Sequence, residues 1–434
     1  MLFVAIFCSS LATTDFIKLV QRETLRLQNV VLSIPFCAAV VIISAPSSRR
    51  NGELSDFGVD TIAHISPTHF LLLSPSHPQY SLEMAHHILV ASYSNDIVTL
   101  TFDPKTASLD VTSSTTVGHH PSWIASHPSH PSIVWTGLEQ YDGKILALTH
   151  DDTGFLDKVA EVTSGGRDPC CLLALENEVL VANYSSGSVA VLPVSGKPLK
   201  FAASPSIVQL SGVGPNKSRQ ESSHPHQVIL HEEYQEIFVP DLGSDCVCRL
   251  KKDKDGSWKL AGHVGIEAGG GPRHVAFYKG DMFTLLELTS KVVRHRLPPL
   301  PEFPKFIKSV PTMSNPPPTP NDMLAAEILI PTPNASFPTP YLYLSNRNDP
   351  SPEGDIISIF SIEEPDSLEL IAEVRTGLKH VRGIVFGGPD DRYLIAGGAN
   401  GGGVKMFERI NGGKSLKEIA SNDSVQAPTG FLWL

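Results

Sequence analysis

The sequence of 434 residues predicts an all-β fold, and three observations support that prediction. Glycine and proline, which interrupt helices and favour turns, number 33 and 35. Charged residues make up 18% of the chain, fewer than the roughly 25% of average soluble domains. Short apolar runs recur along the chain with polar turn residues between them. Many turns, few charges and many short apolar runs are typical of a fold built from short strands.

The first 83 residues differ from the rest of the chain. They hold two apolar runs, 2–7 and 30–44, and the second contains Pro35 and falls short of the about 20 residues that span a bilayer. No basic residue precedes the first run, whereas a secretory signal begins with one. We therefore expect an N-terminal extension over 1–83, either dispensable or an upstream region wrongly included in the chain. A secreted or membrane-associated protein is the alternative if the apolar segment is a real signal.

From Met84 to Leu434 a hairpin pattern recurs seven times. Each copy is a β-rich run, a short polar turn and a second β-rich run. The copies are residues 88–103, 132–151, 178–194, 236–253, 281–297, 341–363 and 392–410. The positions just past their first strands are Ser92, Thr136, Asn183, Asp241, Glu287, Asn346 and Gly398. These positions lie 44 to 59 residues apart, and such a period predicts a seven-bladed β-propeller over 84–434 with four strands in each blade.

The remaining strands are expected in the segments between the hairpins, for example at 275–278 and 384–386. No amphipathic helices alternate with the strands in this sequence, which argues against a parallel βαβ sheet. One segment, 298–340, holds 13 of the 35 prolines. Because proline-rich stretches favour extended, poorly packed chain, we expect an inter-blade insertion with little regular structure apart from a strand at 326–330.

Charge and cysteine content exclude several classes of partner. The net charge of −11 disfavours nonspecific nucleic-acid binding, which depends on Lys and Arg. The six cysteines lack zinc-ribbon spacing and are too sparse for a disulfide framework. Four histidines between 118 and 131 stand among Pro and Ser, and we interpret them as turn residues. We expect free thiols, a cytoplasmic location, no metal, no cofactor, and no nucleic-acid or membrane partner, and the sequence does not predict the oligomeric state.

Six short motifs follow one another in the predicted propeller. They are Ser-His-Pro-His-Gln-Val (223–228), Phe-Val-Pro-Asp-Leu-Gly-Ser-Asp (238–245), Gly-Gly-Pro-Arg-His-Val (270–275), the strand end at Glu287, Tyr-Leu-Ser-Asn-Arg (343–347) and His-Val-Arg-Gly-Ile (380–384). In this order they resemble the lactonase seven-bladed β-propeller family, over about residues 86–434. That family includes propeller-type 6-phosphogluconolactonases and fungal 3-carboxy-cis,cis-muconate lactonizing enzymes. The resemblance does not separate these members by substrate.

The resemblance implies a catalytic set of one His, one Glu and two Arg. Carried over residue by residue, the set is His226, Glu287, Arg273 and Arg347. The Asn that precedes the Glu in the family is Leu286 in this chain, which affects at most a supporting hydrogen bond. The further substrate-binding candidates are Arg382, Asp241, Asn183 and His274. Asp241 is expected to orient an arginine.

These residue types suit lactone chemistry on a small anionic substrate. The guanidinium forks of Arg273 and Arg347 match carboxylate or phosphate groups. Glu287 can transfer a proton if its pKa is raised, and His226 can share that role. In a lactonase the base activates water and an arginine stabilises the oxyanion. We expect a hydrolase of a polyanionic sugar lactone, similar to a 6-phosphogluconolactonase. The alternatives are a 3-carboxy-cis,cis-muconate cyclase, an isomerase that closes the lactone, and a non-catalytic propeller that serves as an interaction platform.

Overall fold

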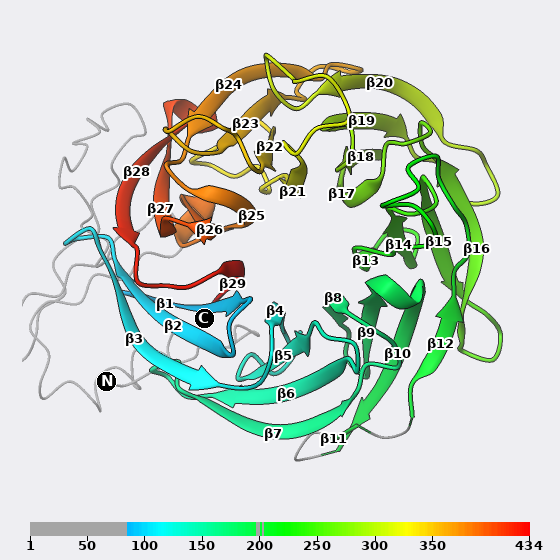
Figure 1. The fold of residues 1–434 in the computed structure, drawn as a ribbon, viewed down its shortest axis with the longest axis horizontal. Helices are drawn as coiled ribbons and strands as arrows, with labels where there is room; N and C mark the ends of the chain where they lie inside the picture. The colour runs from blue at the N-terminus through cyan, green and yellow to red at the C-terminus, as the bar shows by residue number, and fades with distance from the viewer. Residues whose placement is uncertain (1–84, 197–199, 202–203) are drawn as a thin grey trace, which may run out of the picture. The chain divides into compact units, whose positions relative to one another are not determined.

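The strands of this chain form blades arranged in a ring (Figure 1). The computed structural model describes residues 85–196, 200–201 and 204–434, so the extension expected over 1–83 lies outside the described residues. The described strands form seven sheets whose neighbouring strands pair in antiparallel fashion. The predicted all-β, seven-bladed β-propeller is therefore confirmed. The described residues include no helix with the length and hydropathy needed to cross a bilayer.

Each blade uses strands that are consecutive in the chain, apart from blade 1, which takes its innermost strand from the C-terminus. Blade 1 consists of β29 (Pro428–Trp433), β1 (His86–Ser92), β2 (Asp96–Asp103) and β3 (Ser108–Thr116), and blade 2 of β4 (Pro121–Ser126), β5 (Ile133–Leu138), β6 (Lys144–His150) and β7 (Leu156–Thr163). Blade 3 consists of β8 (Pro169–Ala174), β9 (Glu178–Asn183) and β10 (Ser188–Ser195), with β11 (Lys200–Phe201) and β12 (Ser206–Gln209) both paired to β10.

The other four blades follow the same order from the inside outward. Blade 4 consists of β13 (Ile229–His231), β14 (Glu236–Asp241), β15 (Cys246–Lys252) and β16 (Trp258–Gly265), and blade 5 of β17 (Pro272–Tyr278), β18 (Asp281–Leu286), β19 (Lys291–Arg296) and β20 (Lys305–Pro311). Blade 6 consists of β21 (Ala325–Leu329), β22 (Tyr341–Asn346), β23 (Ile356–Ser361) and β24 (Glu369–Arg375), and blade 7 of β25 (Lys379–Gly387), β26 (Tyr393–Gly401), β27 (Gly403–Ile410) and β28 (Ser415–Asn422). Three short 3₁₀ turns, η1 (Tyr184–Ser186), η2 (Pro389–Asp391) and η3 (Asn411–Gly413), complete the described elements.

The hydrophobic core lies between neighbouring blades. On β1, Ile88 and Val90 pack against blade 7, whereas Leu89 and Ala91 pack against blade 2. Because successive side chains of a strand point to opposite faces, a strand covered on both faces needs a continuous apolar run. In the described part of the chain, buried apolar side chains of neighbouring blades form seven clusters, one in each of the seven spaces between blades. The recurring apolar runs of the sequence are therefore the inter-blade core.

The ring is closed by the pairing of β29 with β1. Ile88 lies opposite Trp433, and Val90 lies opposite Phe431. The last strand of the chain thus completes the first sheet and joins the two ends of the propeller (Figure 1).

The proline-rich segment 298–340 is more regular than the sequence led us to expect. The strand expected at 326–330 is present as β21, but the segment also supplies β20, the outer strand of blade 5. Residues 305–310 contain no proline, so their N–H groups remain available to pair with β19. The segment is therefore part of two blades, and the expectation of an insertion with one short strand is wrong on this point.

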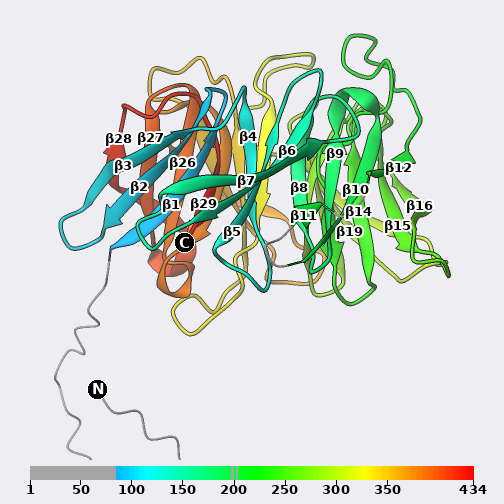
Figure 2. The same cartoon turned by 90° about the horizontal axis from the view of Figure 1, so that it is seen from below.

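One edge of each blade collects the ends of two strands. Because the innermost strand and its neighbour are antiparallel, the first begins where the second ends: Pro272 lies opposite Leu286, and Pro169 lies opposite Asn183. The pairing shifts register just after these prolines, which indicates a β-bulge. A bulge changes the direction of the side chain that follows. Since all blades run between the same two faces of the disc (Figure 2), these edges place residues from distant parts of the sequence at one end of the propeller axis.

Candidate active site

A cavity of about 310 Å³ lies at this edge of the blades. Its lining is mainly polar and charged, and its members come from strand ends and from the connections between blades. They are Glu139, Cys170, Tyr184, Arg219, His226, Glu287, Arg347 and Arg382. A volume near 300 Å³ is at the lower end of the range for small-molecule sites.

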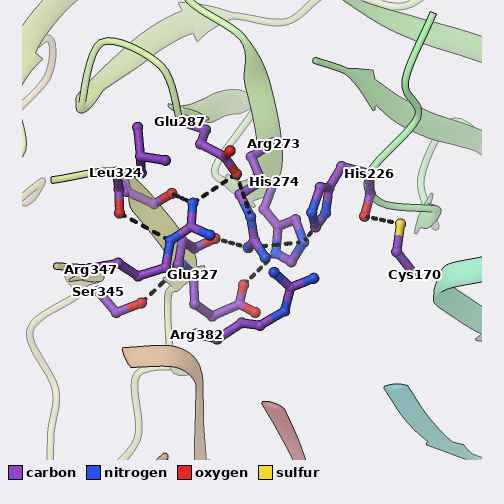
Figure 3. Close-up of polar contacts among 12 residues, drawn as sticks. Cys170, His226, Arg273, His274, Glu287, Leu324, Glu327, Ser345, Arg347 and Arg382 are labelled. Atoms are coloured by element: carbon purple, nitrogen blue, oxygen red, sulfur yellow. Dashed lines mark hydrogen bonds and ion pairs between the residues drawn. The ribbon is translucent and has the colours of Figure 1, made fainter. Parts of the chain in front are cut away.

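The structure brings six of the eight candidate residues together. His226, Glu287, Arg347 and Arg382 line the cavity. Arg273 and His274 are buried behind this lining: Nε of Arg273 lies 3.1 Å from Oε2 of Glu287, and Nε2 of His274 lies 3.2 Å from Nδ1 of His226 (Figure 3).

Asp241 and Asn183 do not line the cavity, in contrast to the expectation that they bind substrate. The carboxylate of Asp241 accepts hydrogen bonds from Oγ of Ser223 and from the N–H groups of His224 and Gly243, at 2.5, 2.6 and 3.1 Å. These donors, rather than an arginine, occupy its oxygens. Asn183 is fully buried and donates to the carbonyl of Ser164 at 3.0 Å. Both side chains therefore stabilise backbone through hydrogen bonds, and those of Asp241 stabilise the turn that precedes His226.

Glu287 is surrounded by three arginines. Its Oε2 lies 2.8 Å from Nη2 of Arg347 and 3.1 Å from Nε of Arg273, and its Oε1 lies 2.5 Å from Nη2 of Arg219. Burial opposes ionisation of this carboxyl, but the three guanidinium groups outweigh burial and hold the pKa of Glu287 well below its usual range. A raised pKa, the condition for proton transfer by Glu287, is therefore not met. Glu287 is a carboxylate that orients arginines.

Backbone carbonyls at the start of blade 6 fix two of these arginines. Arg347 donates from Nε to the carbonyl of Leu324 at 3.2 Å and from Nη2 to that of Ala325 at 3.1 Å. Arg273 donates from Nη1 to the carbonyl of Ala326. Burial, together with the nearby guanidinium groups of Arg382 and Arg347, lowers the pKa of Arg273 to about 10. The site thus holds more positive charge around Arg273 than its carboxylates neutralise.

Arg382 is placed by an aromatic ring and a carboxylate. Its guanidinium carbon lies 5.0 Å from the centre of the Tyr93 ring, a cation–π contact, and its Nη2 lies 3.9 Å from Oε2 of Glu139. The hydroxyl of Tyr93 donates to the Glu139 carboxylate, at 3.2 Å from each oxygen. Tyr93 and Glu139 together hold Arg382 at the cavity wall.

A series of buried polar groups leads from Glu327 to the cavity (Figure 3). Oε1 of Glu327 lies 2.6 Å from Nδ1 of His274, whose Nε2 contacts His226. Burial lowers the pKa of His274, and it lowers the pKa of His226 further together with the charge of Arg273. Both imidazoles are therefore neutral at neutral pH.

The sequence-based reasoning missed Glu139, Cys170, Tyr184, Arg219 and Glu327. Glu139 and Tyr184 directly follow β5 and β9, just as Glu287 directly follows β18. Aligning the hairpins at this position would have found them. Cys170 is the second residue of β8, as Arg273 is of β17. Arg219 lies in an irregular connection, where the repeat carries no signal.

The described cysteines are free thiols, as expected, whereas Cys8 and Cys37 lie outside the described residues. Sγ of Cys246 and Sγ of Cys248 lie 3.7 Å apart on β15, on one face as the alternation predicts. Both sulfurs and an oxygen of Asp241 lie within 4.8 Å of one another, but Asp241 already accepts three hydrogen bonds. Burial raises the pKa of the Cys170 thiol well above its usual range, so this thiol is no nucleophile.

Of the histidines of 118–131, His127 directly follows β4 and contacts backbone with both ring nitrogens. Nδ1 of His127 accepts from the N–H of Ser129 and its Nε2 contacts the carbonyl of Glu176, both at 3.2 Å. His127 therefore holds the turn after β4 and contacts the chain near Glu176, in agreement with its interpretation as a turn residue.

The described strands therefore form a closed seven-bladed propeller with a charged cavity at the ends of its inner strands. Residues 87–433 match the family described as "Lactonase, 7-bladed beta-propeller", and the chain belongs to this family. The resemblance seen in the sequence motifs is thereby confirmed, and the protein is an enzyme, a lactonase.

Relatives and solved structures agree with this family. The chain is 28% identical over 309 residues to a 6-phosphogluconolactonase of Formosa agariphila, which covers 68% of this chain and 82% of the relative. It is 27% identical over 323 residues to the 6-phosphogluconolactonase of Bacillus subtilis, which covers 71% of this chain and 86% of the relative. The structure of a periplasmic gluconolactonase of Pseudomonas aeruginosa shares the fold with a TM-score of 0.67 and 22% identity, covering 81% of this chain and 99% of that one.

Proposed function

We propose that the protein hydrolyses the ring of a phosphorylated sugar lactone of the 6-phosphogluconolactone class. The surplus of guanidinium groups around the cavity carries this proposal. Three arginines line the cavity and Arg273 lies behind them, whereas the lining carboxylates are those of Glu287 and Glu139. A phosphate group supplies negative charge to such a site, and guanidinium forks match its oxygens. The names of the curated relatives support the same substrate class.

His226 is the proposed general base. Its imidazole lines the cavity and is neutral because burial and the charge of Arg273 lower its pKa, so it can accept a proton from water. Glu287 is the poorer candidate, since three arginines occupy its oxygens.

In the proposed reaction, water attacks the carbonyl carbon of the lactone while His226 takes one of its protons. The guanidinium groups of Arg347 and Arg382 stabilise the oxyanion that forms. When the intermediate collapses, the bond between that carbon and the ring oxygen breaks, and the imidazolium returns its proton to the ring oxygen. One water has then been added, the product is a hydroxy acid, and His226 is neutral again.

Arg219 is the proposed phosphate ligand. With 36% of its side chain exposed, it is the most accessible of the four arginines, and it comes from an irregular connection rather than from a blade. Its contact with Glu287 can be exchanged for a contact with phosphate without moving a strand.

Lactone closure, the alternative reaction, requires a group that supplies a proton to carbon. A neutral His226 lacks that proton at the start of the reaction, which favours hydrolysis. We therefore propose hydrolysis, and the assay below includes 3-carboxy-cis,cis-muconate to test for the cyclase reaction.

The test offers the full-length chain 6-phosphogluconolactone, unphosphorylated gluconolactone and 3-carboxy-cis,cis-muconate side by side, with His226→Gln as the control. We expect hydrolysis of the phosphorylated lactone well above both the uncatalysed rate and the rate of the control. Turnover of the muconate alone would assign the cyclase reaction instead. Turnover of none of the three would refute the proposed substrate class.

A further inference from the structure

Glu327 does not line the cavity, yet it contacts the lining through a second histidine. It lies on β21 with 8% of its surface exposed. Its Oε1 accepts from Nδ1 of His274 at 2.6 Å and from the N–H of Ile328 at 3.0 Å. Contact with His274 holds the pKa of the Glu327 carboxyl below its usual value despite burial, so the group is a carboxylate. Among the described residues it is the one carboxylate within hydrogen-bond distance of either imidazole.

The contacts determine where the protons of the two imidazoles lie. A carboxylate only accepts hydrogen bonds, so Nδ1 of His274 carries the proton. Neutral His274 then has its lone pair on Nε2, which also faces Nη1 of Arg273 at 3.4 Å. Nδ1 of His226 lies 3.2 Å from this Nε2, so it carries a proton and donates it to the lone pair. Neutral His226 is left with its lone pair on Nε2, and no described residue donates a hydrogen bond to that nitrogen.

The other groups around His226 do not compete for its ring nitrogens. The Tyr184 ring meets the imidazole edge to face at 5.7 Å, and the Cys170 thiol donates to the backbone carbonyl of His226. His274 meets Trp123 in the same edge-to-face manner at 5.7 Å. The nearest charged groups are Arg273, Arg347 and Arg382. The hydrogen bonds of Arg273 and Arg347 go to backbone carbonyls of blade 6 and to His274, not to a ring nitrogen of His226.

We infer that Glu327 is a positioning residue for the base: through His274 it holds His226 in the tautomer whose Nε2 faces the cavity as an acceptor. This inference rests on the proposed role of His226. When Nε2 takes a proton from water, the resulting imidazolium keeps its Nδ1 proton directed at His274, and the Glu327 charge stabilises it. No proton moves to Glu327, and no bond of the substrate involves it.

The kinetic test is Glu327→Gln in the full-length chain with 6-phosphogluconolactone. An amide can donate as well as accept, so it no longer fixes the proton of His274. We expect kcat to fall by about 10²-fold, the lower end of what general acid–base catalysis contributes, with KM nearly unchanged. Glu327→Asp keeps the charge and should recover part of kcat.

Glu236→Gln is the matched control. Glu236 is also buried, but it pairs with Arg249 at the start of β14, the end of that strand away from Asp241. It should keep kcat. Wild-type kcat in Glu327→Gln would overturn the inference.

A spectroscopic test needs no variant. In the wild-type chain with ¹⁵N-labelled histidine, we expect neutral His226 and His274 that both carry the proton on Nδ1. A proton on Nε2 of His226 would overturn the inference even if the lactone is hydrolysed. If the wild-type chain hydrolyses no lactone, the proposed function fails, whereas a shift of the His226 proton in the NMR spectrum of Glu327→Gln still shows whether Glu327 holds the tautomer.

Discussion

Two buried carboxylates near the same cavity, Glu287 and Glu327, have opposite surroundings. Glu287 contacts three guanidinium groups, whereas Glu327 contacts the imidazole of His274. Arginine keeps its proton at neutral pH, so the Glu287 side binds charge without passing protons. Imidazoles gain and lose protons near neutrality, so the Glu327 side can pass them. In the proposed mechanism the site therefore has an anion-binding half around Glu287 and a proton-transfer half around Glu327, His274 and His226.

The largest effect is expected from breaking the proton-transfer half. His226→Gln removes the base but keeps a polar side chain of similar size, so kcat for 6-phosphogluconolactone should fall by about 10²- to 10⁴-fold. Steady-state kinetics measure this loss, and circular dichroism checks that the propeller is intact. A folded variant with wild-type kcat would remove the distinction between the two halves.

Breaking the anion-binding half should affect stability first. Glu287→Gln leaves three guanidinium groups without their shared counter-charge, so we expect the free energy of unfolding to fall by about 3–5 kcal/mol. Urea unfolding measures the change. Glu139→Gln is the control, because Glu139 is more exposed and lies 3.9 Å from Arg382. It should cost less than about 1 kcal/mol, and an equal cost for both variants would contradict the central place of Glu287.

A third variant sharpens the division by substrate. Arg219→Ala removes the proposed phosphate ligand, so kcat/KM should fall by about 10- to 150-fold for the phosphorylated lactone, as expected for one hydrogen bond to a charged group. It should change little for unphosphorylated gluconolactone. For the phosphorylated lactone, kcat/KM of Arg219→Lys should lie between the values of the wild type and of Arg219→Ala, because Lys keeps the charge without the planar fork. Equal losses on both substrates would move Arg219 from phosphate binding to catalysis.

Acidification should lower the free energy of unfolding, first through the buried histidines and then through Glu287. In the folded protein the pKa of His226 lies well below 6.5, and burial lowers the pKa of His380, the second residue of β25, to about 4. The unfolded chain therefore binds more protons as the pH falls below 6.5. Glu287 also has a depressed pKa when folded, so its stabilisation is present above its ordinary value of 4.5 and is lost as the pH falls below that value. The free energy of unfolding should therefore decrease from pH 7 to pH 4, and urea unfolding at a series of pH values measures it. A flat profile would contradict the buried neutral state of His226.

The smallest effect is expected from metal removal. Every proposed step uses imidazole or guanidinium groups and none needs metal-activated water, so treatment with a chelator should leave kcat/KM within about twofold. A larger loss would contradict the proposed metal-free mechanism.

The propeller could be predicted from the sequence because each hairpin has a local pattern, two β-rich runs with a polar turn between them, that is visible without knowledge of the rest of the fold. The strands expected at 275–278 and 384–386 lie within β17 and β25, for instance. The strand β20 was not predicted from the sequence because many prolines precede and follow its proline-free run of six residues, 305–310. The overall proline content of 298–340 therefore outweighed its local pattern.

The candidate site could be predicted only as far as motifs reach. Glu287 stands out in a motif, but its low pKa arises from arginines 219, 273 and 347, which only the ring of blades brings together. Glu327 lies on a strand that the sequence does predict, yet nothing in the sequence shows that it faces His274, 53 positions earlier. The chemical state of the site follows from tertiary contacts, and those contacts are long-range.

Rescue of His226→Ala by added imidazole tests the division of the site most directly. Removing the side chain leaves space for a free imidazole beside His274, in the position of the proposed base. We expect the variant to lose hydrolysis of 6-phosphogluconolactone and to regain part of it, saturably, as imidazole is added, above the rate of imidazole without enzyme. Arg219→Ala should gain nothing. Full activity of His226→Ala without imidazole, or no recovery with it, would contradict the assignment of proton transfer to His226.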